Sequence, residues 1–169
     1  HNDAETVTLT ADDGNGNTQS CTFTVTLKDI TPPNVFCKPF TAALNASGMV
    51  SIVPSDVYQS GSDNCGTVNL VSVLPNSFNC SNLGPNTVVL TVNDGNGNTS
   101  SCNAVVTVVD LVPPTMLCKA VTVALNGAGT ASIIAAQVDN GSSDNCTLTN
   151  RSVSPSSFTC ANLGPNTVT

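Results

Sequence analysis

The sequence has few aromatic and few charged residues. It contains no Trp, one Tyr and five Phe, and charged side chains make up only 9% of its 169 residues. Aromatic burial can contribute little to a core of this composition, and small domains with thin cores usually need covalent or metal staples. Eleven acidic residues against four basic ones give a net charge of −7, which argues against nucleic acid and anionic membrane as partners.

Residues that several function classes require are also missing. The only histidine is His1, so nucleophilic catalysis lacks a general base and we expect no enzymatic activity. No C-x-x-C pair is present, which argues against a zinc site. No apolar run reaches membrane-spanning length, so we expect no membrane insertion. No leader is visible at the start, and we therefore expect an internal piece of a longer precursor.

The chain does have eight cysteines, and they lie on an internal repeat. The motif D-G-N-G-N-T-x-S-C at Asp13–Cys21 returns 81 residues later at Asp94–Cys102, and F-x-C at Phe78–Cys80 returns at Phe158–Cys160. A long fixed period indicates an array of similar modules. Cysteines at repeated spacings indicate disulfides formed in an oxidising compartment outside the cytosol.

Strict alternation of Thr with apolar residues predicts β-strands in each module. Thr6–Ala11 and Thr22–Leu27 alternate in this way, and Asp-Gly-Asn-Gly-Asn between them supplies the residues that a hairpin turn needs. Thr87–Val92 and Asn103–Val109 repeat the pattern one period later. We therefore expect each module to end in a β-hairpin.

The remaining residues of a module predict further short strands. Two Pro-Pro joints, at Pro32-Pro33 and Pro113-Pro114, separate the modules because proline cannot donate to a strand ladder. Gln59–Cys65 reads as a polar loop. The other predicted strands are Val35–Cys37, Phe40–Leu44, Val50–Val53, Val68–Val73 and Ser77–Cys80. About seven short strands in 80 residues indicate an all-β, immunoglobulin-like sandwich in tandem modules.

These patterns also place the module boundaries. Residues 1–29 are the C-terminal hairpin of one module, residues 32–110 are a complete module, and residues 113–169 are the first part of a third. The third stops just inside the counterpart of the strand at Thr87–Val92.

These motifs together resemble hyalin-type (HYR-like) repeats. The joint D-x-T-P-P, the S-D-N-C loop, F-x-C and the V-x-L-T-V-x-D-x-x-G-N hairpin carry the resemblance over essentially the whole chain. They are most similar to the four-cysteine version found in giant secreted proteins of Bacteroidetes-type bacteria, which include gliding-motility adhesins. The resemblance implies an immunoglobulin-like β-sandwich, an extracellular or cell-surface location and an adhesive or filament-forming role. It implies no catalytic residues.

Cysteine pairing can be argued from the expected topology. The first and last strands of an immunoglobulin-like module are adjacent, which favours a Cys37–Cys102 bond. That bond leaves Cys65–Cys80 and, by repetition, Cys146–Cys160, although four cysteines allow three connectivities. Cys21 and Cys118 then have partners outside this segment, either in flanking modules or in a neighbouring subunit.

Calcium is the candidate cofactor, because it takes oxygen ligands from closely spaced Asp and Asn. Asp139, Asn140 and Asp144 lie in one loop, and the preceding module offers Asp63 with Asp56. Asp29 and Asp110 lie at the joints. Asp12, Asp13 and Asp94 open the hairpin turns and are weaker candidates, since Asp favours turns for backbone reasons alone.

The sequence therefore predicts a structural or adhesive segment of an extracellular filament, stalk or adhesin. Its partners would be neighbouring modules of the same polypeptide or neighbouring subunits, with a surface or polysaccharide ligand as a further candidate. One alternative is a carbohydrate-binding or spacer module of a secreted enzyme. The other is a filament subunit that polymerises by strand donation. A residue count weighs against donation, because the strand at Val7 and the strand at Val168 occupy the same module position.

Overall fold

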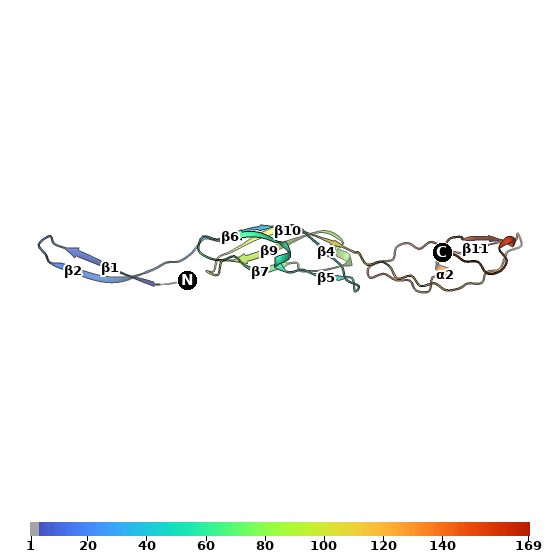
Figure 1. Ribbon diagram of the computed structural model, residues 1–169, viewed down its shortest axis with the longest axis horizontal. Coiled ribbons are helices and arrows are strands. Elements are labelled where there is room, and N and C mark those ends of the chain that lie inside the picture. The colour runs from blue at the N-terminus through green and yellow to red at the C-terminus, as the bar shows by residue number, and fades with distance from the viewer. Residues whose placement is uncertain (1–3) are drawn as a thin grey trace. The chain divides into compact units, whose positions relative to one another are not determined.

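The computed structural model describes residues 4–169, so His1 and the first two residues after it lie outside the described residues. It contains mainly strands and confirms the all-β class (Figure 1). The described residues form two compact units. Unit 1 comprises residues up to Phe40 with Ile52–Asn76 and Pro85–Thr107, and unit 2 comprises Thr41–Ser51, Ser77–Gly84 and Val108–Thr169.

The units are interleaved along the chain, whereas the expected modules 1–29, 32–110 and 113–169 are contiguous. The module boundaries and the sandwich arrangement therefore stay predictions. No helix within residues 4–169 is long and apolar enough to cross a membrane.

The first hairpin consists of β1 (Ala4–Asp12) and β2 (Thr18–Thr26), which pair antiparallel from Ala4↔Thr26 to Asp12↔Thr18. Its turn begins at Asp13, whose carboxylate accepts the backbone N–H groups of Asn15 and Asn17. Gly14 and Gly16 have φ of 74° and 90°, which glycine adopts without steric cost. Every residue of both strands is exposed, so this hairpin has no core of its own.

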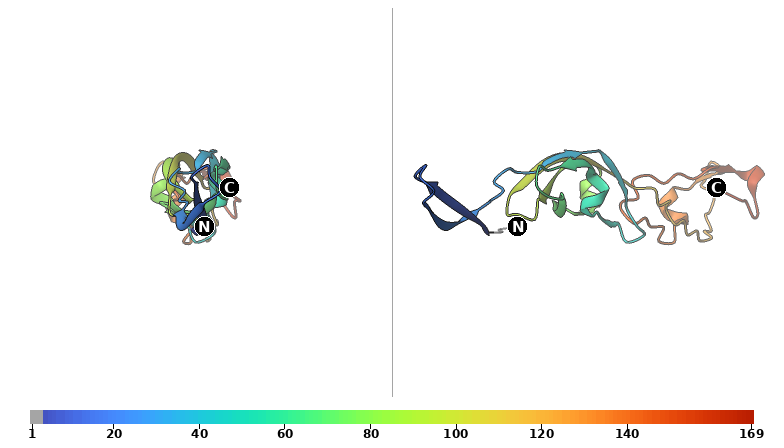
Figure 2. Two further views of the ribbon diagram at one scale, coloured as in Figure 1. Left: turned by 90° about the vertical axis from the view of Figure 1, so that its left-hand side faces the viewer. Right: turned by 60° about the vertical axis from the view of Figure 1, so that its left-hand side comes forward.

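The middle repeat, residues 32–110, is built on a four-stranded sheet in the order β4-β10-β9-β7. Its four strands are labelled in Figure 1, and Figure 2 shows the same ribbon from two further sides. Two further sheets have two strands each, β3 with β6 and β5 with β8. The bounds are β3 Asn34–Cys37, β4 Phe40–Ala43, β5 Met49–Ser51, β6 Tyr58–Ser62, β7 Asn69–Leu74, β8 Ser77–Asn79, β9 Gly84–Asn93 and β10 Thr99–Val109. A four-residue helix, α1 (Pro54–Val57), precedes β6, and a 3-10 turn, η1 (Cys80–Asn82), follows β8.

Alternate residues of the long strands form the core. Along β9 and β10 the buried and exposed positions alternate, as expected for strands with one face on a core. The buried apolar residues of unit 1 are Ile52, Val57, Val73, Val88, Leu90, Val92, Ala104 and Val106. Those of unit 2 are Ala42, Leu44, Phe78, Val108, Ile133 and Phe158.

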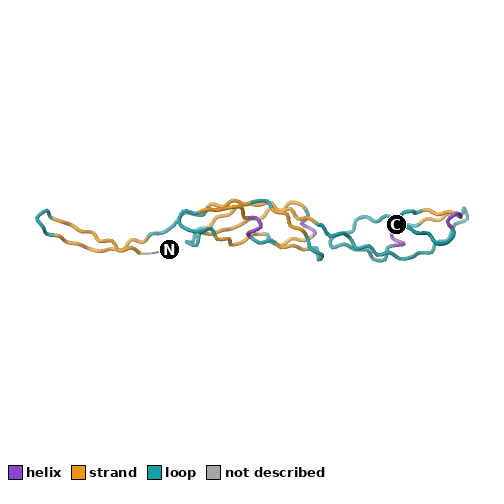
Figure 3. Tube along the Cα trace, in the orientation of Figure 1, coloured by secondary structure: helices purple, strands orange, loops and turns teal. Residues whose placement is uncertain are grey.

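Residues 113–169 contain less regular structure than the middle repeat, as the secondary-structure colours of Figure 3 show. They hold β11 (Thr130–Ser132), β12 (Ser157–Thr159), the helix α2 (Ala135–Val138) and the 3-10 turn η2 (Cys160–Asn162). Residues 121–124 are the sequence counterpart of β4 but form no strand. In the middle repeat β4 pairs with β10, and the sequence given holds no counterpart of β10 after residue 113.

One element differs from its prediction. The residues Gln59–Cys65, expected as a polar loop, lie mostly in β6, which pairs with β3 through Val35↔Gly61 and Phe36↔Ser60. The strand could not be predicted from its polar composition. A two-stranded sheet at the surface depends on backbone pairing and needs few apolar side chains.

Candidate functional site

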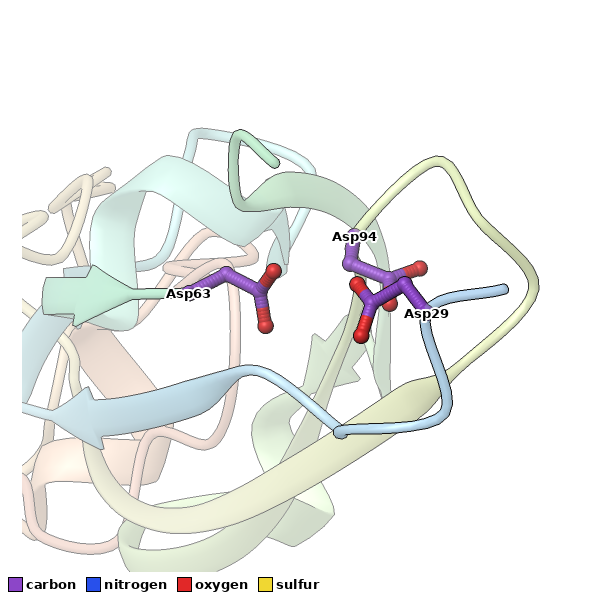
Figure 4. A group of neighbouring side chains, drawn as sticks. All are labelled: Asp29, Asp63 and Asp94. Atoms are coloured by element: carbon purple, nitrogen blue, oxygen red, sulfur yellow. The ribbon is translucent and has the colours of Figure 1, made fainter. Parts of the chain in front are cut away.

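Three carboxylates from separate segments meet in unit 1. Asp29 follows β2, Asp63 follows β6 and Asp94 follows β9, and a ligand oxygen of each lies within 4.8 Å of the others. Figure 4 shows the side chain of Asp63 pointing toward the carboxylates of Asp29 and Asp94. Asp29 belongs to the joint, Asp63 to the S-D-N-C loop (Ser62–Cys65) and Asp94 to the hairpin turn of the middle repeat. These three segments therefore meet at one point.

The turn after β9 holds Asp94 in place. One oxygen of Asp94, Oδ1, accepts the backbone N–H groups of Asn96 at 2.7 Å and Asn98 at 3.1 Å. The S-D-N-C loop can approach this turn because residue 66 is glycine. A Cβ at Gly66 would lie 2.6 Å from the backbone oxygen of Asp94, which is too close for any side chain.

Two asparagine amides connect the three segments. Nδ2 of Asn96 donates to Oδ2 of Asp29 at 3.2 Å and to the backbone oxygen of Cys65 at 3.1 Å. Nδ2 of Asn98 donates to Oδ2 of Asp94 at 2.5 Å and to the backbone oxygen of Asp29 at 3.3 Å. The Asn residues of D-G-N-G-N thus do more than form a turn, because they bind the joint to it.

One carboxylate of the cluster, that of Asp94, is buried. Asp94 is only 3% exposed. Burial raises its pKa, but hydrogen bonds from the Asn98 side chain and from two backbone N–H groups outweigh burial and leave the pKa lowered. Asp63 has a buried oxygen, Oδ1, without a hydrogen-bond partner among the described residues. Several carboxylate oxygens facing one point are the ligands that Ca²⁺ prefers.

The other residues predicted for calcium lie elsewhere. Among residues 4–169, Asp29, Asp63 and Asp94 form the one group of three acidic ligands. Asp56 accepts the backbone N–H of Val53 at the start of α1. Asp110 accepts from the backbone of Val112 and from the Asn145 amide. Asn140 donates its backbone N–H to Leu117.

The Asp139–Asp144 loop is held together by protein contacts. Asp139 accepts the backbone N–H of Ser142 at 2.9 Å and forms an ion pair with Arg151. Hydrogen bonds from Ser142, and then the Arg151 guanidinium, lower the pKa of Asp139 to about 2. Asp144 accepts the backbone N–H of Cys146 through Oδ2, and its Oδ1 is buried without a partner among the described residues. Arg151 therefore already balances one of the two carboxylates expected to hold a cation.

Of the three predicted disulfides, the structure contains one. Cys37 and Cys102 are bonded, with their Cα atoms 5.9 Å apart. The topology behind the bond differs from the expectation, because β3, which carries Cys37, pairs with β6, and the strand that pairs with β10 is β4.

The predicted pairs Cys65–Cys80 and Cys146–Cys160 are wrong in this structure. Cys80 is bonded to Cys146 instead, with a Cα–Cα distance of 5.4 Å, and both residues belong to unit 2. Both predicted pairs lie within one repeat. The loop carrying Cys146, however, packs against the end of the preceding repeat, where η1 holds Cys80. Cys21, Cys65, Cys118 and Cys160 are exposed thiols.

The D-G-N-G-N motif predicts a turn at Asp94, and the sequence pattern does not group this residue with Asp29 and Asp63. A signal for it is present in the sequence, because Asp94 opens a motif that occurs twice and lies two residues after the predicted strand Thr87–Val92. Sequence alone does not show that the turn and the joint lie at the same end of the repeat.

Comparisons with known proteins agree with a repeat of hyalin type. No family model matches the sequence, and no solved structure matches it. Among curated proteins, hyalin of Strongylocentrotus purpuratus is 34% identical over 137 residues, which is 78% of this chain. The chain spans 11% of the length of hyalin. The similarity supports a hyalin-repeat-like domain in this chain.

Proposed function

We propose that the chain is a structural and adhesive segment of an extracellular array of β-repeats. The similarity to hyalin over 137 residues is the observation that carries this proposal. The disulfides support it, because such bonds persist in oxidising compartments outside the cytosol. The role is mechanical: stapled repeats and stiff joints hold a binding function at a distance from the surface that anchors the array.

The disulfides are placed to resist extension. The bonds Cys37–Cys102 and Cys80–Cys146 span 65 and 66 residues, and the two spans overlap in the sequence. Stretching between the ends can therefore release only part of the chain.

A single-molecule pulling experiment on the 169-residue chain tests this mechanical role. We expect the oxidised chain to reach roughly half the extension of the reduced chain, from the reach of about 3.5 Å per extended residue and the overlapping spans. Equal extensions before and after reduction would contradict the proposal. Binding of the same chain to a panel of polysaccharides, without any resistance to extension, would favour the carbohydrate-binding alternative.

A calcium ion is the second part of the proposal, with Asp29, Asp63 and Asp94 as its ligands. The three carboxylates lie within reach of one ion, and the partnerless Oδ1 of Asp63 provides a free acceptor. Calcium at this place would fasten the joint to the S-D-N-C loop and the hairpin turn, and so would stiffen the array between repeats.

Thermal unfolding with calcium and with a chelator tests the ion. We expect calcium to raise the melting temperature, since a ligand at 100 times its Kd stabilises the folded state by about 2.7 kcal/mol. Asp63→Asn and Asp94→Asn should remove this shift. Asp13→Asn is the matched control, because Asp13 makes the same turn contacts as Asp94 but belongs to no group of three acidic ligands among residues 4–169. An identical melting temperature in calcium and chelator would contradict the site.

A further inference from the structure

The Cys80–Cys146 bond joins a specific pair of surfaces. One surface is the end of the middle repeat, formed by the turn Asn45–Gly48 and by Cys80. The other is the S-D-N-C loop of the following repeat. Nδ2 of Asn145, the residue before Cys146, donates to the backbone oxygen of Asn45 at 3.2 Å. The two surfaces are therefore held together by a hydrogen bond as well as by the disulfide.

Gly48 is needed for this contact. It is buried, with φ of +69°. A Cβ there would lie 2.7 Å from the backbone oxygen of Asn145 and 2.8 Å from Sγ of Cys80. The turn therefore has no room for a side chain at residue 48 on the side that faces Asn145.

Each of the two surfaces also occurs in another repeat of the chain, where the facing surface does not contact it. The first recurs at Asn126–Gly129 and Cys160: Gly129 has φ of +73°, and Sγ of Cys160 lies 3.7 Å from its backbone oxygen, against 3.8 Å between Cys80 and Gly48. A Cβ at Gly129 would meet Sγ of Cys160 but no second loop.

The second surface recurs at Asp63–Cys65. The Asp63 carboxylate accepts the backbone N–H of Cys65 at 3.0 Å, as Asp144 accepts that of Cys146 at 3.1 Å. Cys65 and Cys160 are both exposed thiols.

We propose that Cys65 and Cys160 are the two halves of a repeat-to-repeat disulfide. Cys160 bonds to the S-D-N-C cysteine of a following copy of the repeat, and Cys65 bonds to the F-x-C cysteine of a preceding copy. Consecutive repeats are then joined covalently as well as through their joints. This proposal rests on the array proposed above and names the partner of its unpaired thiols.

The bond forms by thiol–disulfide exchange with a disulfide oxidant such as oxidised glutathione. The thiolate of Cys160 attacks the oxidant and releases one reduced glutathione. The thiolate of Cys65 from the other copy then attacks the mixed disulfide and releases the second. Two thiols are oxidised and one glutathione disulfide is reduced to two thiols.

A second molecule of this chain carries the parts that such a contact needs. Residues 113–169 surround an open cavity of about 630 Å³ lined by Val121, Val123, Leu125, Ile133, Val138 and Phe158 among others. Ile133 and Phe158 are buried, whereas Leu125 and Val138 are only half-buried. The counterparts of the last two, Leu44 and Val57, are at most 4% exposed in the middle repeat, which contains the β9–β10 hairpin.

The hairpin β1–β2 is the sequence counterpart of β9–β10 and has an uncovered apolar face. Leu9 is 63% exposed, whereas its counterpart Leu90 is fully buried. Phe23 and Val25 are 47% and 37% exposed. The hairpin of one molecule thus supplies the strands that the open cavity of another lacks. Residues 4–8 of the docking hairpin and residues 165–169 of the other molecule correspond to the same part of β9, so the docking hairpin displaces those last residues. This docking brings Cys65 of the first molecule toward Cys160 of the second. It also places Cys21 and Cys118 in the positions of the bonded pair Cys102 and Cys37.

The test mixes unlabelled and ¹⁵N-labelled 169-residue chains in a glutathione redox buffer, blocks free thiols and maps the disulfides by mass spectrometry. We expect a Cys160–Cys65 peptide with one labelled and one unlabelled half, together with intact Cys80–Cys146. Leu9→Asp should abolish the crosslink by putting a charge on the docking face, and Thr8→Asp, on the opposite face of β1, should retain it.

Three results would overturn the proposal: no mixed-label Cys160–Cys65 peptide, indiscriminate pairing among all four free thiols, or an intrachain Cys65–Cys80 bond. If Cys80–Cys146 forms and calcium still raises the melting temperature while no crosslink appears, the proposed function stands and this proposal alone fails.

Discussion

Gly48 shows how much one residue decides at the contact between repeats. Its positive φ and the approach of Asn145 and Cys80 both require a residue without Cβ. We expect Gly48→Ala to lower the free energy of unfolding by roughly 1–3 kcal/mol more than Gly129→Ala, from the usual cost of overpacking a tight contact. Chemical denaturation of the two oxidised variants measures the difference.

Gly129 is the matched control because it has nearly the same φ and the same close cysteine, but no facing asparagine. Equal losses in the two variants would mean that the loop at Asn145 does not press on Gly48.

Asp139 predicts a pH dependence of stability. Hydrogen bonds from Ser142 and the ion pair with Arg151 lower its pKa from 3.8 to about 2. A carboxyl whose pKa is lower in the folded state contributes its stabilisation above the unfolded pKa and loses it as the pH falls through the folded pKa. We therefore expect the stability of unit 2 to fall between pH 3.8 and about 2.

Denaturant unfolding at a series of pH values checks this expectation. Asp139→Asn should show a shallower fall over the same range, because the amide does not titrate. A variant with the same profile as the parent chain would assign the acid sensitivity to other carboxyls.

At the scale of elements, the two hairpins are a natural comparison of one sequence pattern in two environments. Leu90 in β9 is fully buried, and its counterpart Leu9 in β1 is 63% exposed. Leu90→Ala should cost about 2–5 kcal/mol of unfolding free energy, the usual range for a buried leucine. Leu9→Ala should change stability by no more than about 0.5 kcal/mol, as for other surface positions. Thermal or chemical unfolding of the monomer distinguishes the two.

Most strands could be predicted because their pattern is local. Alternation of Thr with Val and Leu predicts β1, β2, β9 and β10, and glycines at positive φ mark their turns. β6 was missed because a surface strand with polar side chains depends on its backbone partner β3, which lies more than twenty residues away. Nothing in the local composition of Gln59–Ser62 signals that pairing.

The candidate site was predicted in part for the same reason. Asp29 and Asp63 are predicted as calcium ligands because a joint and a polar loop carry their carboxylates, but their meeting with Asp94 depends on which ends of the strands coincide. The bond between Cys80 and Cys146 depends on how one repeat meets the next. Reasoning within a single repeat has no access to that contact.

For the molecule as a whole, one disulfide forms within a repeat and the other links two repeats. Cys37–Cys102 closes the middle repeat on itself, and Cys80–Cys146 ties it to the following S-D-N-C loop. Each of the four remaining cysteines occupies the same position in its repeat as one of the bonded cysteines. In the array that we propose, extension would then meet covalent resistance both within the repeats and between them.

The connectivity of the cysteines tests this account most directly. The 169-residue chain is oxidised at a concentration low enough to keep it monomeric, its free thiols are blocked, and the digested peptides are identified by mass spectrometry without reduction. The account predicts Cys37–Cys102 and Cys80–Cys146, with blocked thiols at Cys21, Cys65, Cys118 and Cys160. Cys65–Cys80 together with Cys146–Cys160 would contradict it, because every bond would then lie within a single repeat.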